Sequence, residues 1–165
     1  MPNCSEKSKT LLGFWSNAHG VQSLTEQGLS DNLDVVVETE VRRTESKEKV
    51  ASAVSNLFKV GELRVEEDRV VFTSENIESL RFLKDQLRDR RVRSAARRLL
   101  LSNSGVDSFQ TFLLLNKQAA TVGIAALCDD PRESALGPIV LRIKSPRLQE
   151  VISWLTFGYE ASETS

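Results

Sequence analysis

The stretch LDVVVETEV, residues 33–41, decides the fold of this chain. In an extended conformation its side chains alternate, and one face carries four β-branched residues: Val35, Val37, Thr39 and Val41. β-Branched residues with a period of two predict a strand. The sequence therefore predicts a sheet, and the segments on either side must supply its other strands and its covering layer.

A helix and a hairpin are predicted directly after this strand. Thr44 is a candidate N-cap with Glu45 in the first turn, and apolar residues recur at helical spacing until Gly61. Residues 63–72 then alternate on both sides of an acidic turn, which predicts a β-hairpin.

The middle of the chain predicts a long helical segment. Ser74 is its candidate N-cap, and an apolar stripe runs from Ile77 to Leu100. The stripe loses its phase near Arg90-Arg91, so we expect a bend or break there. Asn103-Ser104-Gly105 ends the segment.

The last third of the chain predicts further strands and one more helix. Residues 109–115 read as a buried strand, residues 116–120 interrupt it, and residues 122–127 resume extended character. Residues 139–143 predict the last strand, and Ser145-Pro146 begins a helix that ends before Gly158.

Strands and helices in this order show no regular β-α-β alternation. The order predicts an α+β fold with two layers, a mostly antiparallel sheet with helices packed on one face. Residues 32–158 are expected to form a single domain, residues 1–31 a disordered or non-native extension, and residues 159–165 a frayed tail. Met1 is the only methionine, so translation could instead begin further on, for example near Val21.

Composition excludes several classes of protein. The 165 residues carry a formal net charge of −1. No apolar run approaches the roughly 20 residues that span a bilayer, so we expect a cytoplasmic protein that does not enter membranes. His19, Cys4 and Cys128 are too few and too scattered for a zinc site or a catalytic triad, and no phosphate-binding glycine loop occurs. We therefore expect that the protein is not an enzyme and binds no cofactor.

One acidic group leaves an alternative open. Asp129, Asp130 and Glu133 could hold a magnesium ion and, together with Lys117, form an enzyme site. The same residues fit a solvated loop beside Pro131. We favour the loop, because nothing in the sequence fixes the carboxylates in space.

The main functional signal is the run RDRRVRSAARR, residues 88–98. It contains one acid and six arginines: Arg88, Arg90, Arg91, Arg93, Arg97 and Arg98. Arg81 and Lys84 extend it upstream. A guanidinium group binds phosphate through two parallel hydrogen bonds and stacks on bases, so the run predicts an RNA-binding helix surface. Pairing with acids elsewhere, such as Glu62 or Asp68, is the open alternative.

A second polar group adjoins a very apolar strand. Asn116 and Gln118 can read base edges, and Lys117 can hold a phosphate. Alternatively, the two amides satisfy backbone groups where the strand breaks. The aromatic residues argue against binding of single-stranded RNA, because single-strand binders display exposed stacking rings. Here the rings are expected mostly in the core: Phe58, Phe72, Phe82, Phe109, Trp154, Phe157 and Tyr159.

Three segments together resemble Uncharacterised Protein Family 0201 of archaea. They are SLRFLKDQLRDRRVRSAARRLLL (79–101), FLLLNKQAATVG (112–123) and SALGPIVLRI (134–143), followed by a helix with ISWL. The resemblance covers about residues 33–157. It implies a fold similar to the large-subunit ribosomal protein that binds 5S ribosomal RNA, and a role in RNA binding.

The family pattern falls on Arg88, Arg91 and Arg97, on residues 116–120 and Gly123, and on Leu136-Gly137. This chain departs from it at residues 125–128, where relatives are more polar or acidic, which argues against a ligand role for that strand end.

We therefore expect a non-catalytic protein that binds structured RNA through the arginine-rich helix. The alternative is an accessory subunit that binds a protein partner in a nucleotide-metabolising or ribosome-associated complex.

Overall fold

The computed structural model describes residues 28–104 and 109–156. Its centre is a six-stranded sheet in the order β2-β3-β1-β6-β4-β5, and every neighbouring pair of strands is antiparallel. The strands are β1 (Asp34–Glu40), β2 (Glu62–Val65), β3 (Arg69–Ser74), β4 (Gln110–Asn116), β5 (Leu127–Cys128) and β6 (Pro138–Lys144). The predicted antiparallel sheet is confirmed.

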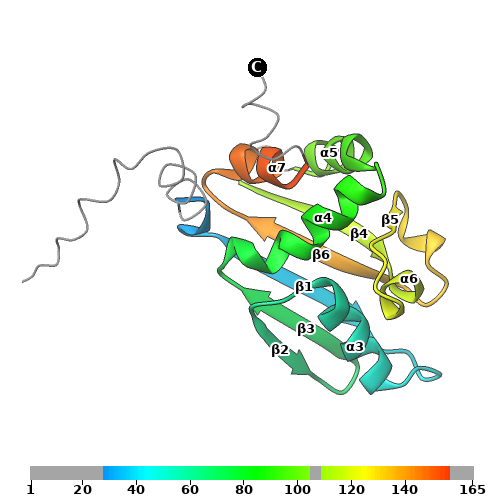
Figure 1. Cartoon of the computed structure of the whole chain (residues 1–165). Coiled ribbons are helices and arrows are strands. Elements are labelled where there is room, and N and C mark those ends of the chain that lie inside the picture. The colour runs from blue at the N-terminus through cyan, green and yellow to red at the C-terminus, as the bar shows by residue number, and fades with distance from the viewer. Residues whose placement is uncertain (1–27, 105–108, 157–165) are drawn as a thin grey trace, which may run out of the picture.

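The four longer helices lie on the same side of this sheet (Figure 1). The helices are α3 (Lys47–Leu57), α4 (Arg81–Asp89), α5 (Arg93–Ser102), α6 (Lys117–Thr121) and α7 (Leu148–Thr156), with 3-10 turns η2 (Ile77–Leu80) and η3 (Pro131–Glu133). Buried side chains of α3, α4, α5 and α7 form one hydrophobic core with the strands. The fold is therefore α+β with two layers.

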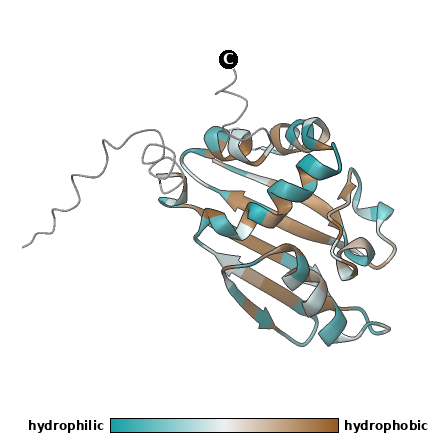
Figure 2. Cartoon of the chain, viewed as in Figure 1, coloured by the Kyte–Doolittle hydropathy of each residue, from teal (hydrophilic) through white to brown (hydrophobic). Residues whose placement is uncertain are grey.

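Alternation along β1 separates the two faces of the sheet. Val35 and Val37 are fully buried beneath the helices, and Thr39 is 3 % exposed. Burying a valine side chain stabilises the fold by about 1.5 kcal/mol or more. Figure 2 shows the apolar strands running beneath the helices, whose other faces are more polar. The pattern in residues 33–41 thus places the core as the sequence predicts.

The other surface of the sheet is covered by no helix among the described residues. Val36, Arg142 and Phe112 lie on it, side by side across β1, β6 and β4. We call this surface the open face. The loop of residues 129–137, which contains η3, borders it at one end.

Two predicted helix caps are wrong by two residues. Ser46, rather than Thr44, caps α3 through its hydroxyl, so Glu45 lies before the helix. Asn76, rather than Ser74, caps η2 through its side-chain oxygen. Side chains of similar capping chemistry stand two residues apart in both places, and their spacing alone does not select between them.

The start of the packed domain, the strand expected at residues 122–127 and the burial of Phe109 also differ from the predictions. Leu29 is fully buried in the core, so the packed domain includes residues before 32. Of the expected strand 122–127, only Leu127 is in a strand, because residues 122 and 123 form a turn after α6, with Gly123 at φ 78°, and residues 124–126 are irregular. Phe109 is 52 % exposed, although it was expected in the core. The expectations for residues 1–27 and 157–165 lie outside the described residues.

No helix in the described part of the chain is long and apolar enough to cross a membrane.

Candidate nucleic-acid interface

The arginine run forms the end of α4, a tight turn, and α5. Leu87 of α4 and Ala96 and Leu100 of α5 are fully buried, which anchors both helices in the core. The predicted break is confirmed, because α4 ends at Asp89 and α5 begins at Arg93. Arg90 lies in the turn between the two helices.

Backbone hydrogen bonds hold the turn in one conformation. The N–H of Arg91 donates to the carbonyl of Arg88 at 3.1 Å, and the N–H of Val92 donates to the carbonyl of Leu87 at 3.0 Å. These two bonds form a Schellman motif, whose first residue past the cap adopts left-handed geometry and is usually glycine. Here that residue is Arg91, at φ 58°. A non-glycine residue in this conformation costs about 1–2 kcal/mol.

Replacing Arg91 with glycine is expected to stabilise the protein. Glycine adopts the left-handed conformation without a Cβ penalty but loses more entropy on folding, so the net gain in the free energy of unfolding is about 0.5–1 kcal/mol. Chemical denaturation of Arg91→Gly and Arg91→Ala measures it, since alanine keeps the strain and should leave stability nearly unchanged. Equal stability of the glycine and alanine variants would show that the turn stores no strain.

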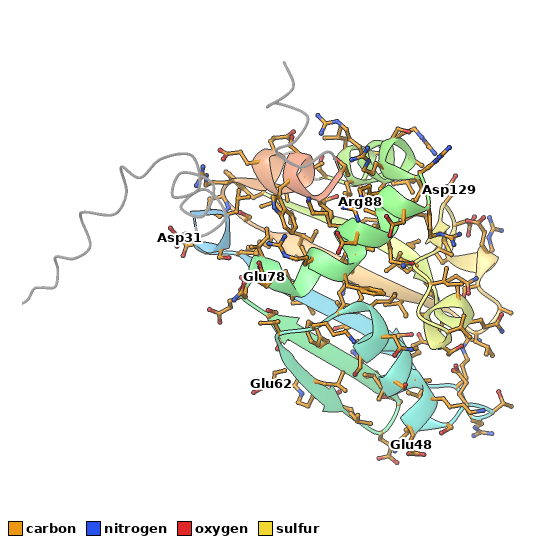
Figure 3. The ribbon with its side chains drawn as sticks, viewed as in Figure 1. Asp31, Glu48, Glu62, Glu78, Arg88 and Asp129 are labelled. Atoms are coloured by element: carbon orange, nitrogen blue, oxygen red, sulfur yellow. The ribbon has the colours of Figure 1, made fainter. Side chains whose placement is uncertain are left out.

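Four of the six arginines face solvent without an internal partner. Within the described residues, no side-chain hydrogen bond or ion pair engages Arg90, Arg91, Arg93 or Arg98. We call these four residues the arginine surface. Arg93 is half-buried and the other three are exposed. Figure 3 shows Arg88 at the end of α4, beside nitrogen-tipped side chains that project from α5.

The remaining two arginines of the run have partners. Arg88 donates from Nε to the Asp89 carboxylate at 3.2 Å, and its Nη1 lies 3.6 Å from the Asp85 carboxylate. Arg97 donates to the hydroxyl of Ser153 on α7 at 3.4 Å. Acid pairing, the alternative for this run, therefore applies to Arg88, and its acids come from α4 itself and not from the hairpin.

Arg81 and Lys84 pack against α7. Arg81 donates to the Glu78 carboxylate at 2.6 Å and 3.0 Å, and this bond lowers the pKa of Glu78 below its usual value. Arg81 lies 5.6 Å and Lys84 5.3 Å from the centre of the Trp154 ring, which is 1 % exposed. These two cations stabilise the docking of α7.

Lys117 is a structural residue, which corrects the expectation that it holds a phosphate. Its side chain is 2 % exposed, and its ammonium lies 3.0 Å from the buried carboxylate of Glu45. The ammonium also donates to the backbone carbonyls of Glu40 and Leu136, each at 2.7 Å. Three hydrogen bonds use all three of its donors. RNA cannot reach it while these bonds hold.

The two amides beside Lys117 differ in exposure. Asn116 caps α6 by accepting from the N–H of Ala119 at 2.9 Å, which is the structural role weighed for it from the sequence. Gln118 is exposed, so its role as an RNA contact stays a prediction.

The acidic loop carries its own internal bonds. The Glu133 carboxylate accepts from the backbone N–H groups of Asp129 and Asp130. Asp130 accepts two hydrogen bonds from Arg132, which lower the pKa of Asp130 below its usual value. In the described residues, no group of three His, Cys, Asp or Glu side chains is placed to hold a metal ion.

Comparison with known proteins identifies the family. A family model described as RNA binding matches residues 34–145. A UPF0201 protein of Sulfurisphaera tokodaii is 39 % identical over 126 residues, which cover 74 % of this chain and 86 % of the relative. A second, from Methanothermobacter thermautotrophicus, is 40 % identical over 121 residues, with 73 % and 89 % covered. The chain belongs to the UPF0201 family.

Solved UPF0201 structures share the fold. One matches with a TM-score of 0.63 and 27 % identity, covering 74 % of this chain and 92 % of its own. The UPF0201 protein of Methanococcus jannaschii matches with a TM-score of 0.65 and 26 % identity, covering 74 % and 98 %. The resemblance to Uncharacterised Protein Family 0201 is thus confirmed. The similarity to the ribosomal protein that binds 5S ribosomal RNA stays a prediction.

The structure also exposes residues of this UPF0201 chain that sequence reasoning did not select. Phe112 and Arg142 lie next to each other on the open face, although Phe112 sits in a run of apolar residues that reads as fully buried. Strand alternation was the available signal, because Thr111 and Leu113 share one face and Phe112 takes the other.

Proposed function

We propose that this protein binds structured RNA through the arginine surface. The observation that carries the proposal is that Arg90, Arg91, Arg93 and Arg98 present guanidinium groups to solvent without internal partners in the described residues. The family's description as RNA binding supports the ligand class. The proposal is of a binding protein that performs no catalytic step and works in the cytoplasm.

The geometry suits contact with a phosphate backbone. Arg93 and Arg98 lie about 7.5 Å apart along the axis of α5 and about 140° apart around it, at about 1.5 Å and 100° per residue, so they can reach phosphates on either side of the helix. Arg90 and Arg91 add two cations at the helix start, in a turn that backbone hydrogen bonds hold rigid. Each contact between a cation and a phosphate releases condensed counterions, which favours binding at low salt. Because the turn is already ordered, binding costs little backbone entropy, and the entropy lost is mainly that of the arginine side chains.

A protein partner is the second candidate, and the edge strand β2 favours it. Its Leu63 and Val65 are 38 % and 48 % exposed, and Val60 just before it is 56 % exposed. Among the described residues β2 pairs only with β3, so no described strand occupies its outer backbone groups, which another chain could bind. An accessory subunit could dock an extended segment there.

Capture of the tagged full chain from a cell extract separates the two functions. We expect RNA to co-purify with the wild-type chain at about 0.1 M salt and to be released as salt rises, because phosphate contacts are screened and counterions compete. Ribonuclease treatment should remove the bound material. Protein partners that survive ribonuclease, together with no captured RNA, would replace the RNA proposal with the accessory-subunit function.

A further inference from the structure

The open face presents an aromatic ring in a row of polar and apolar side chains. Register places Thr73, Val36, Arg142 and Phe112 opposite one another across β3, β1, β6 and β4. Phe112 is 37 % exposed, whereas the neighbouring Leu113 and Leu115 on the helix side are fully buried. Phe112 is the outermost residue of this row, because within the described part of the chain β5 pairs only with Leu114 and Leu115. An exposed ring on a sheet surface gives a flat area on which a nucleobase can stack.

Two hollows extend from this row in opposite directions. One, of about 630 Å³, is lined by Glu38, Val140, Arg142 and the loop that contains η3. The other, of about 430 Å³, is lined by Phe112, Lys144 and Arg142. Arg142 lines both hollows, so they adjoin at this residue, and we call the two hollows together the groove.

Cations outnumber carboxylates along the groove. Its lining includes five basic residues, Arg42, Arg69, Arg132, Arg142 and Lys144, and three acidic residues, Asp34, Glu38 and Glu40. Four of the five basic residues lie near a carboxylate. Arg142 and Arg69 lie 3.4 Å and 4.0 Å from Glu38, and Arg69 also lies 3.7 Å from Asp68. Arg42 lies 3.7 Å from Glu40, and Arg132 pairs with Asp130. Lys144 has no side-chain partner among the described residues.

Amide side chains stand close to the ring. Gln110 lies opposite Lys144 on the open face, two residues before Phe112 in β4. Asn103, at the end of α5, donates to the backbone carbonyl of Phe112 at 2.9 Å and lines the same hollow. Amides of this kind hydrogen-bond the edges of unpaired bases. Asn103 also connects the groove to the helix that carries Arg93 and Arg98.

We propose that the open face binds a single-stranded segment of RNA. A base stacks on Phe112, and Lys144 holds an adjacent phosphate. Arg142, opposite Phe112, contacts a second phosphate by exchanging its ion pair with Glu38 for it. From Val140 to Lys144, the open-face side chains of β6 span about 14 Å, at about 3.4 Å per residue, which accommodates two or three nucleotides. The inference rests on RNA as the ligand of this protein, and it assigns the unpaired part of that RNA to the sheet and the duplex part to the arginine surface.

The test compares two RNAs on the full chain. The probes are a fluorescent eight-nucleotide oligouridylate and a blunt RNA duplex, and fluorescence anisotropy gives each dissociation constant. Phe112→Ala is expected to weaken oligouridylate binding by about 5- to 100-fold, the usual effect of losing one stacking ring. Duplex binding should be unchanged. Phe109→Ala is the matched control, because it removes an exposed phenylalanine that precedes β4 and should change neither affinity.

Each outcome is decisive. Wild-type duplex binding with no oligouridylate binding, or an unaltered oligouridylate affinity in Phe112→Ala, overturns the sheet site and leaves the arginine surface standing. Oligouridylate binding that depends on Phe112, with no duplex binding, supports the sheet site and removes the arginine surface. Binding of neither RNA ends both proposals. A thermal unfolding curve of each variant confirms that the fold is intact.

Discussion

Replacing Lys117 with methionine is expected to lower the free energy of unfolding by about 3–5 kcal/mol, the usual effect of breaking a buried ion pair from one side. The carboxylate of Glu45 is 8 % exposed and would lose its cationic partner. Among the described residues, it would keep only the hydrogen bond that the N–H of Arg42 donates. The carbonyls of Glu40 and Leu136 would also lose a donor. Equilibrium unfolding in urea measures the change.

The matched control changes the neighbouring exposed residue in the same way. Gln118→Met should alter stability by less than about 0.5 kcal/mol. A double variant, Lys117→Met with Glu45→Met, should recover part of the loss, because an apolar pair replaces the isolated buried charge. A loss below about 1 kcal/mol in Lys117→Met alone would mean that this ion pair does not hold the loops together.

Changing Arg90, Arg91, Arg93 and Arg98 together to alanine is expected to weaken binding of duplex RNA by about 10²- to 10³-fold at low salt. Each lost guanidinium removes a charge-assisted hydrogen bond and one released counterion. Alanine is a good helix former, so α5 should persist. Filter binding with a labelled blunt duplex gives the affinity.

A matched variant separates location from total charge. Arg43, Lys47, Lys49 and Lys59 are exposed cations on or next to α3, away from the arginine turn. Changing these four to alanine shifts the net charge by the same amount as the arginine variant. We expect at most a few-fold loss of duplex affinity from this control. Equal losses in both variants would indicate an unlocalised electrostatic attraction.

The fold was largely predictable because strand alternation reports burial directly. Residues 33–41 identified a strand with one buried face, and the structure has β1 in that place with Val35 and Val37 fully buried. The loss of phase near Arg90-Arg91 located the break between α4 and α5. The prediction of extended structure for residues 122–127 failed because the turn that ends α6 includes Val122 and Gly123, and the apolar pattern of the segment does not show where that turn stops.

The sequence could not show which charged side chains of the site pair with each other in the folded protein. Lys117 carries the charge of a phosphate-binding residue, yet its partner Glu45 lies 72 positions earlier in the chain. The run 88–98 identified a cationic segment, but only coordinates separate Arg88, which contacts two carboxylates, from Arg91, which has no partner in the described residues. Charge is visible in a sequence, whereas neutralisation by a distant residue is not.

The salt dependence of duplex RNA binding tests the central claim most directly. The logarithm of the wild-type association constant should fall linearly with the logarithm of salt concentration, and the slope should become shallower by about four when the four arginines of the surface become alanine. The control on α3 should keep the wild-type slope. Identical slopes for the wild-type chain and the arginine variant would contradict RNA binding by this surface.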